Sequence, residues 1–323
     1  MKYEIKNDSV DPNDADTYHD REHPEDSMRP YYPKVHIVIL NWDGQEVLRE
    51  CIDSIEKMEY TNYEIIVVDN GSSDGSQNMV RDVFPSAHMI INKTNVGVAE
   101  GQNIGMRYAV NCGAEYILIT NNDVTFDKRC LTELMEVAES DNRIGIIGPK
   151  IYYSEMPNKI WQAGRYLNWN KGTCIIEGNE IDIGQYDEQK EVDFLGVILI
   201  RKNVLEKIGL YQANFFAYWE DTDFCVRAHK AGFKIVYAPK AKIWHKVSYT
   251  TKRIKGFFEY FSTRNRFWFM KSHATNRQYL LFLSYFFGYH FWLLSASHIL
   301  YHKDPNAFRS FLWGIIDGLK NAP

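Results

Sequence analysis

The sequence predicts an α/β protein in which a mostly parallel sheet carries helices on both faces. Apolar, β-branched runs at residues 63–69 and 116–123 are typical of strands, and each is followed by a segment with helical periodicity. Because these runs are apolar almost throughout, we expect strands buried on both faces, as in a parallel sheet. Strands and helices alternate at the spacing of βαβ units, whose crossovers are right-handed.

The composition is that of a globular protein with a substantial core. Of the 323 residues, 45% are hydrophobic and 24% are charged. The formal net charge of −5 argues against a nucleic-acid binder that relies on bulk positive charge. The five cysteines are scattered and never spaced as CxxC, which favours reduced thiols in a cytosolic protein over disulfides or zinc. The polar, acidic first residues show no signal-peptide core.

The elements of the first half follow one another regularly. Residues 1–34 are rich in Asp, Glu, His, Tyr and Pro, with almost no aliphatic side chains, which predicts a flexible acidic extension. The polar run at 70–76 follows the second strand and can cap the next helix. We expect strands at 35–41, 63–69, 88–92, 116–123 and 144–148, and helices at 46–58, 95–110 and 131–138.

The second half is less regular. Residues 152–189 place Trp161, Tyr166 and Trp169 among glycines and polar residues, and we interpret them as hairpins and loops that form one wall of a site. We expect a strand at 192–200 interrupted by Gly196, helices at 203–208 and ending near 231, and extended pieces at 234–239 and 241–245.

Two common nucleotide motifs are missing from the sequence. No GxGxxG follows the first strand, and no GxxxxGK[ST] occurs anywhere. The sequence therefore disfavours hydride transfer with a dinucleotide and the chemistry of P-loop proteins.

Acidic residues gather where chemistry is expected. Asp69 and Asp123 each end an apolar run, and ligands of open α/β sheets bind outside the carboxyl ends of the strands. Glu220, Asp221 and Asp223 stand at the start of a helix, whose dipole favours ionised carboxylates. Carboxylate oxygens hold Mg²⁺ or Mn²⁺, and a charged carboxylate beside a hydroxyl can act as a general base. The alternative interpretation of the strand end at Asp123 is a polar turn. The alternative interpretation of Glu220, Asp221 and Asp223 is ordinary helix capping.

Five motifs occur in order between residues 37 and 223. They are a first strand, a polar turn, a glycine-rich helix start, a strand ending in Asn-Asn-Asp, and an aromatic Glu-Asp segment. In the sequence these read Ile37-Val-Ile-Leu-Asn41, Val67-Val-Asp-Asn-Gly-Ser-Ser-Asp-Gly-Ser76, Asn95-Val-Gly-Val-Ala-Glu-Gly-Gln-Asn-Ile-Gly105, Leu118-Ile-Thr-Asn-Asn-Asp123 and Phe216-Ala-Tyr-Trp-Glu-Asp-Thr-Asp223.

From about residue 35 to 245, the chain resembles the family 2 glycosyltransferases of GT-A fold, which are inverting and take a sugar from a nucleotide donor. The rhamnosyltransferase-like branch is the most similar. The resemblance implies a GT-A fold with a Rossmann-like sheet and a helical C-terminal extension. It also implies that residues 35–250 form the catalytic domain, with a nucleotide-sugar half at 35–150 and an acceptor half at 151–250.

The resemblance assigns roles to the matching residues. Asp69 would contact the nucleoside, and Asp123 would hold Mg²⁺ or Mn²⁺ against the diphosphate. His245 matches a histidine that completes the metal shell in some relatives, although a lone histidine after an extended segment is usually structural. The donor-binding set is Asn41, Asp69, Asn70, Gly97, Asn103, Asn122 and Asp123.

On the acceptor side, Asp221 would be the base that deprotonates the acceptor hydroxyl, and Glu220 is the alternative base. The acceptor-binding set is Gly196, Trp219, Asp223 and Arg264. Arg264 lies in a YxxRN segment that also resembles the same branch, where it would meet phosphates of an anionic acceptor. Capping of a neighbouring element is its alternative role.

One residue departs from the family pattern. Asn121 stands where a strict DxD motif has its first acid, which leaves Asp123 as the firmer ligand. We interpret the site as altered and still active. The competing hypothesis is a non-catalytic module that binds a sugar nucleotide or a glycan.

The C-terminal region, residues 251–323, is expected to be helical and rich in aromatic side chains. Residues 279–294 are apolar and of marginal length for a membrane span, and basic residues flank them. We predict a membrane-facing helical hairpin, with a homodimer interface as the alternative. Residues 308–319 form a second amphipathic stripe through Phe308, Leu312, Ile315, Ile316 and Leu319.

Together these observations predict a metal-dependent, inverting glycosyltransferase in the cytoplasm, peripheral at the inner face of the cell membrane. The acceptor would be a glycan or a polyprenyl-linked sugar, and dTDP-rhamnose is the expected donor by branch resemblance. No nucleic acid is expected as a partner.

Overall fold

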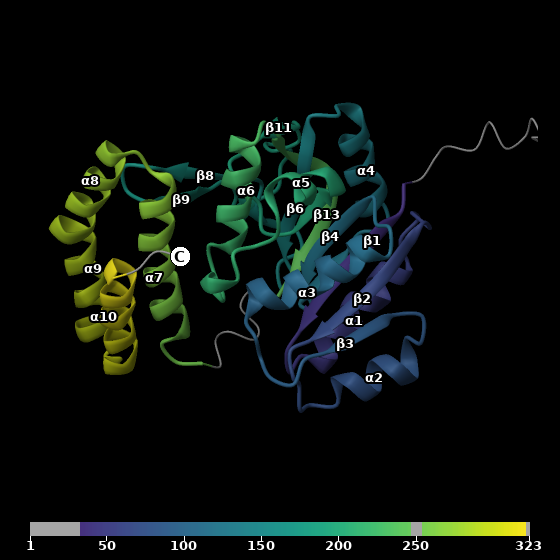
Figure 1. Cartoon of the computed structure of the whole chain (residues 1–323), viewed down its shortest axis with the longest axis horizontal. Helices are drawn as coiled ribbons and strands as arrows, with labels where there is room; N and C mark the ends of the chain where they lie inside the picture. Colours follow the sequence, from purple (N-terminus) through teal and green to yellow (C-terminus); the bar gives the residue numbers. More distant parts are fainter. Residues whose placement is uncertain (1–32, 247–253, 321–323) are drawn as a thin grey trace, which may run out of the picture. The chain divides into compact units, whose positions relative to one another are not determined.

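A computed structural model describes residues 33–246 and 254–320 (Figure 1). The predicted acidic extension at 1–34 therefore lies outside the described residues, except for its last two positions. The predicted fold class is confirmed, because strands and helices alternate around a central, mainly parallel sheet with a helical C-terminal region.

Four parallel strands form the first half of the sheet. They are β1 (Val35–Asn41), β2 (Tyr63–Asp69), β3 (His88–Ile91) and β4 (Tyr116–Asn121), and they lie in the order β4-β1-β2-β3. Every residue of β1 is buried, as its continuous apolar run predicts. The register aligns Asn41 with Asp69, so both polar ends meet at one edge of the sheet.

Beyond β4 the sheet becomes mixed. Strand β12 (Ile198–Arg201) runs antiparallel between β4 and β6 (Ile144–Tyr153), and β13 (Lys234–His245) runs parallel to β6. The predicted pieces 234–239 and 241–245 are thus one strand, which shifts register between Ala238 and Lys242. The shorter strands are β5 (Val124–Phe126), β7 (Lys159–Gln162), β10 (Glu180–Ile181) and β11 (Lys190–Glu191).

The predicted strand at 192–200 is wrong for its first six residues. Only Ile198–Arg201 joins the sheet, because the preceding backbone is bonded elsewhere. Phe194 donates to the carbonyl of Arg165, and the Asp193 carboxylate accepts from the amide of Leu167. These bonds hold the segment against a separate hairpin formed by β8 (Arg165–Asn168) and β9 (Thr173–Ile176).

Helices cover both faces of the sheet (Figure 1). One face packs against α1 (Gln45–Glu56), α2 (Ser76–Val83) and α4 (Cys130–Ser140); the other packs against α3 (Val98–Asn111), α5 (Lys202–Ile208) and α6 (Glu220–Lys230). Helix α3 approaches β1 closely because Gly105 faces the strand, and a Cβ there would lie 2.2 Å from Val38 Cγ1.

The C-terminal region is helical, as predicted. Helix α7 (Phe257–His273) packs against α10 (Pro305–Lys320). Between them, α8 (Asn276–Tyr285) and α9 (Phe291–Ala296) are joined and extended by π-type turns at Phe286–His290 and Ser297–Tyr301. A separate aromatic cluster holds these helices together, including Phe267, Phe282, Phe286 and Phe311.

Helix α10 confirms the predicted stripe in part. Ile315 is buried, and Phe308 and Leu312 pack against the aromatic cluster, whereas Ile316 and Leu319 are exposed. The buried face also includes Phe311, Gly314 and Gly318, and the two glycines allow the backbone to approach α7 closely. A Cβ at Gly314 would lie 2.7 Å from the carbonyl oxygen of Tyr260.

Within the described residues, one helical stretch is long and apolar enough to cross a membrane, by length and composition only. It runs from Asn276 to Tyr301, and just 17% of its most apolar window is buried. A core helix of comparable composition would be mostly covered by protein, so this stretch presents an uncovered apolar surface.

Candidate active site

The carboxyl ends of three neighbouring strands bring predicted donor residues together. Asn41 at the end of β1 donates through Nδ2 to Asp69 Oδ2 at 3.0 Å, and its Oδ1 accepts from Asn122 Nδ2 at 2.6 Å. Asp69 Oδ1 also accepts from the amide of Ser72 and from Gln77 Nε2, both at 2.9 Å. Asp69 is fully buried, so the structure gives it the task of ordering the turn after β2. Its contact with a nucleoside stays a prediction.

Asn70 and Gly97 join this turn to the start of α3. The Asn70 amide donates to the Gly97 carbonyl at 3.0 Å. Gly97 has a φ of +90°, and a Cβ there would lie 2.6 Å from the ring of Phe216, so only glycine fits. The carbonyl of Phe216 accepts from the amide of Ala99 at 3.1 Å and from that of Val98. The donor half and the aromatic Glu-Asp segment are therefore in direct contact.

Asn103 is engaged with the protein itself. Its side chain donates to the Tyr211 carbonyl and accepts from the Tyr211 amide, both at 2.9 Å. This pair of bonds fastens α3 to the loop before α6. In the structure Asn103 thus supports the site from outside, and its predicted contact with the donor stays a prediction.

Asp123 and His245 meet, as the metal prediction requires. Asp123 follows β4, and its Oδ1 lies 3.1 Å from Nε2 of His245 at the end of β13. Asn121, two positions before Asp123 in the sequence, is exposed. Among the residues that the structure describes there is no cluster of three or more His, Cys, Asp or Glu side chains that could hold a metal. A carboxylate and an imidazole still fit a divalent cation whose remaining ligands are water and substrate phosphates.

Asp221 is presented at the first turn of α6. Its Oδ1 accepts from the amide of Thr222 at 2.6 Å and from the Thr222 hydroxyl at 3.1 Å. Its Oδ2 faces Arg165 Nη1 at 3.7 Å, which is an ion pair and too long for a hydrogen bond. One oxygen is therefore fixed by the protein, and the other keeps lone pairs with which to accept a proton.

Glu220 has a different environment from its neighbour. Burial, and secondly the charge of Asp221, raise the pKa of Glu220 to about 8. Its Oε2 is buried without a hydrogen-bond partner among the described residues. This raised pKa favours the protonated form of Glu220, which makes Glu220 the weaker candidate for the general base.

The turn before α6 has an unusual backbone. Phe216, Tyr218 and Trp219 have φ values of 64°, 66° and 73°, a region that side-chain-bearing residues rarely adopt. Asn265 on α7 donates through Nδ2 to the carbonyls of Phe215, Ala217 and Tyr218 at 2.7–2.8 Å. Such backbone strain persists only where the surrounding structure holds it, and here helix α7 does so through Asn265.

The predicted acceptor residues are distributed around this turn. Asp223 is buried and is bonded to Arg227 Nε at 2.8 Å, while its other oxygen lies 2.7 Å from His273 Nε2, so it joins α6 to α7. Arg264 donates to the carbonyls of Asn214 and Phe215, which is the alternative, capping role. Trp219 packs on Phe269. Gly196 lies beside Arg165, and a Cβ there would be 3.6 Å from Nη2.

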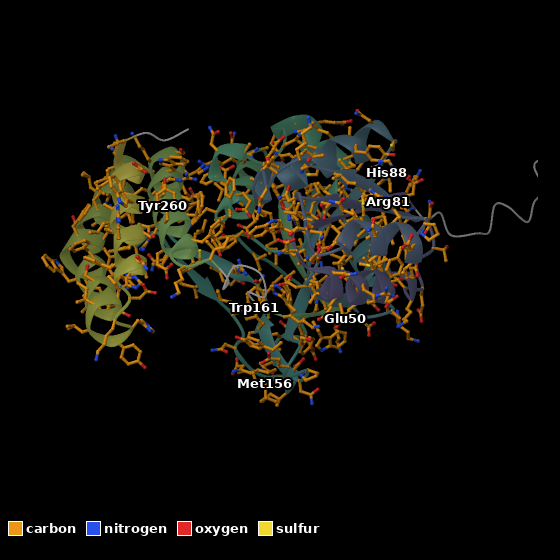
Figure 2. The ribbon with its side chains drawn as sticks, turned by 90° about the horizontal axis from the view of Figure 1, so that it is seen from below. Glu50, Arg81, His88, Met156, Trp161 and Tyr260 are labelled. Carbon is orange, nitrogen blue, oxygen red and sulfur yellow. The ribbon has the colours of Figure 1, made fainter. Side chains whose placement is uncertain are left out.

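The sequence-based prediction missed two residues, Arg165 and Asn265. Arg165 reaches Asp221 from the β8–β9 hairpin, over the ring of Trp161 (Cζ to centroid 5.3 Å). Figure 2 shows Trp161 nearer the sheet and Met156 at the outer end of the same part of the chain. The aromatic residues at 161–169 indicated a wall of the site, but no spacing rule connects Arg165 to Asp221. Asn265 was visible only as part of the YxxRN segment.

The fold is that of a GT-A glycosyltransferase, and the family comparison agrees with it. The model of the family described as glycosyl transferase family 2 matches residues 35–209. The chain belongs to this family and is a nucleotide-sugar-dependent glycosyltransferase.

Several relatives are named as glycosyltransferases, and their sequence identity to this chain is modest. The low-salt glycan biosynthesis hexosyltransferase Agl10 of Haloferax volcanii is 26% identical over 239 residues, covering 72% of this chain and 73% of the relative. The dTDP-rhamnosyl transferase RfbF of Shigella flexneri is 24% identical, covering 69% and 72%. The N-acetylglucosaminyl-diphospho-decaprenol L-rhamnosyltransferase of Mycobacterium tuberculosis is also 24% identical, covering 67% and 77%.

Solved structures support the fold. TarS 1-349 of S. aureus superimposes with a TM-score of 0.56 at 15% identity, covering 87% of this chain and 81% of that one. The mannosyltransferase PcManGT of Pyrobaculum calidifontis, in complex with GDP-Man and Mn²⁺, gives 0.53 at 14%, covering 90% and 88%. At these identities the likeness establishes the architecture alone.

Proposed function

We propose that this protein is a metal-dependent, inverting glycosyltransferase that moves a sugar from a nucleoside diphosphate donor to the hydroxyl of a glycan or lipid-linked acceptor. The observation that carries the proposal is the environment of Asp221. Thr222 fixes one carboxylate oxygen, and the other is left free to accept a proton, beside a Glu220 whose pKa is raised by burial. A positioned carboxylate of this kind is suited to general-base catalysis.

On the donor side, Asp123 and His245 would hold Mg²⁺ or Mn²⁺. A bound divalent cation supplies positive charge against the diphosphate, which gains negative charge as the glycosidic bond breaks. Asn41, Asp69 and Asn122 keep the three strand ends in one arrangement, so that the loops which receive the nucleotide are ordered before it binds. The Mn²⁺ in the PcManGT complex supports the choice of a divalent cation.

The transfer itself follows from the placement of the base. Asp221 Oδ2 would take the proton of the acceptor hydroxyl as its oxygen attacks the anomeric carbon from the face opposite the diphosphate. The glycosidic C–O bond then breaks, the nucleoside diphosphate leaves with the electron pair, and the configuration at the anomeric carbon is inverted in one displacement. The single candidate base supports this one-step path.

The names of two relatives guide the substrate proposal. RfbF is named a dTDP-rhamnosyl transferase, and the mycobacterial relative is named for a diphospho-decaprenol acceptor. We therefore propose dTDP-rhamnose as the first donor to test and a polyprenyl-diphosphate sugar as the acceptor. The uncovered apolar surface of residues 276–301 suits contact with the inner face of the cell membrane, where such an acceptor would lie.

The test is release of nucleoside diphosphate from a panel of donors with Mn²⁺ or Mg²⁺, measured for the wild type, Asp221→Asn and Asp123→Asn. We expect turnover with at least one donor, a loss of about 10²-fold or more in Asp221→Asn, and unchanged donor affinity in that variant. A wild type that binds a donor without turning it over would identify the non-catalytic binding module. Unchanged turnover in both variants would refute the assigned roles.

A further inference from the structure

The guanidinium of Arg165 is left without hydrogen bonds beside the base. Its Nε is buried and has no partner, and no protein acceptor lies within hydrogen-bond range of its other nitrogens among the described residues. Among the described residues, the carboxylate that lies within 4 Å of this guanidinium is that of Asp221, at 3.7 Å. By contrast, Arg227 donates to Asp223 and to the carbonyls of Ile208 and Leu210. An arginine with a structural task is bonded like Arg227, and Arg165 is not.

The position of Arg165 is nevertheless well fixed. Its carbonyl accepts from the amides of Asp193 and Phe194, which anchors the start of β8. Its guanidinium lies over the rings of Trp161 and Phe194, with Cζ at 5.3 and 5.5 Å from the two centroids. Such contacts attract a guanidinium without using its N–H groups as hydrogen-bond donors to oxygen. The donors of Arg165 are therefore held in place and unused.

The surroundings leave room for a ligand at this edge. The Arg165 side chain is 16% exposed, so it can be reached from solvent. Gly196 has no side chain to cover it, since a Cβ there would already touch Nη2 at 3.6 Å. Trp161 in turn packs edge-on against His245, with ring centroids 4.9 Å apart, and His245 meets Asp123. Arg165 thus stands between the metal end of the site and the base.

We propose that Arg165 binds a phosphate oxygen of a substrate. The ligand class is a diphosphate ester, because a guanidinium with unused N–H donors matches two phosphate oxygens with two parallel N–H···O bonds. Within the proposed function, on which this inference rests, two substrates carry that group: the nucleotide-sugar donor and a polyprenyl-diphosphate acceptor. Binding of either would place an anion on Arg165 while Asp221 keeps its free oxygen for the hydroxyl.

The test uses equilibrium binding and is independent of turnover. Titration calorimetry measures the affinity of the full-length protein for dTDP, UDP and GDP with Mn²⁺, and separately for farnesyl diphosphate, in the wild type, Arg165→Met and Arg165→Lys. Arg143→Met is the control, since it removes the same charge from an exposed arginine at the start of β6. We expect at least a tenfold loss in Arg165→Met for one probe class, a smaller loss in Arg165→Lys, and no change in the control.

The two arms distinguish the sources. A loss confined to the nucleotides assigns Arg165 to the donor, and a loss confined to farnesyl diphosphate assigns it to the acceptor. Affinities within twofold of the wild type for every probe would overturn the inference, even if turnover fell, because Arg165 would then serve only Asp221. If Arg165→Met does not fold, Arg165→Gln replaces it and is judged by the same criterion. A wild type that turns over no donor refutes the proposed function instead.

Discussion

The side-chain amide of Asn265 donates to the carbonyl of Ala217 at 2.7 Å, and this bond joins helix α7 to the turn that presents Asp221. The same nitrogen also reaches the carbonyls of Phe215 and Tyr218. A residue of the C-terminal region therefore holds the backbone on which the base depends. The C-terminal helices are part of the active-site framework in this protein, in addition to any surface role.

Replacement of Asn265 by Ala should release this turn. Three carbonyls lose a donor, and the strained residues 216–219 can relax, so we expect kcat to fall by about 10- to 100-fold through misplacement of Asp221. The free energy of unfolding should fall by about 2 kcal/mol. The affinity for the nucleotide-sugar donor should change little. Steady-state kinetics and urea unfolding measure these effects, with Asn276→Ala, an exposed position on α8, as the control. An unchanged kcat would show that the turn keeps its shape without Asn265.

Glu220 should make the protein less stable as pH rises. In the folded state its pKa is raised to about 8 from an ordinary value of 4.5, so between these values the folded protein holds a proton that the unfolded chain has lost. The free energy of unfolding therefore decreases with pH in this window, by up to about 1.4 kcal/mol per pH unit from this group, and the effect ends above the folded pKa.

Glu220→Gln removes that titration. Urea unfolding at several values between about pH 5 and 8 should give a flatter dependence on pH than in the wild type. Glu206→Gln, an exposed change on α5, should leave the slope as it is. Equal slopes in the wild type and Glu220→Gln would mean that Glu220 is ionised in the folded protein.

His245 should set the requirement for metal. Loss of the imidazole in His245→Gln leaves Asp123 as the one predicted protein ligand of the metal, and we expect the Mn²⁺ concentration for half-maximal activity to rise by about tenfold, or about 1.4 kcal/mol. Chelation with EDTA should abolish activity, and added Mn²⁺ should restore it. His229→Gln, on the exposed end of α6, is the matched control. An unaltered Mn²⁺ requirement would assign His245 to packing with Trp161.

The apolar surface of residues 276–301 should bind lipid. Trp292 and Leu300 are 64% and 72% exposed, so their replacement by Ser removes apolar contact area without opening the core. We expect the double variant to bind vesicles of anionic lipid about tenfold more weakly in co-sedimentation, with unchanged thermal stability. Ile183→Ser, at an apolar position that is 85% exposed elsewhere, controls for surface hydrophobicity. If the wild type does not bind vesicles but sediments as a dimer, and the double variant sediments as a monomer, the surface is a subunit interface.

The strands and the strand-end residues were predictable, because they depend on local pattern. Apolar runs fix where β1, β2 and β4 lie, and parallel topology then brings Asn41, Asp69 and Asn122 to one edge. The functions of Asn103 and Asp223 were not predictable in this way. Both belong to motifs, but their partners, Tyr211 and His273, are chosen by tertiary packing.

Long-range partnerships account for the rest of the site. Arg165 lies 56 positions before Asp221 and on a hairpin whose place no periodicity specifies. The observed strand is shorter than the one predicted at 192–200 for the same reason, since the backbone amide of Phe194 donates to the carbonyl of Arg165 in that hairpin. The buried face of α10 extends beyond the predicted stripe because two glycines allow a close contact with α7.

The carbonyl of Phe216 has a wider consequence for the chemistry. It accepts from the first amides of α3, at the end of a helix where exposed N–H groups and the dipole would otherwise attract an anion. The chain thus fills with its own oxygen the position at which many nucleotide-binding proteins hold a phosphate. The first two amides of α3 are therefore already bonded, and the charge of a bound diphosphate would be compensated by a cation or by other groups of the site.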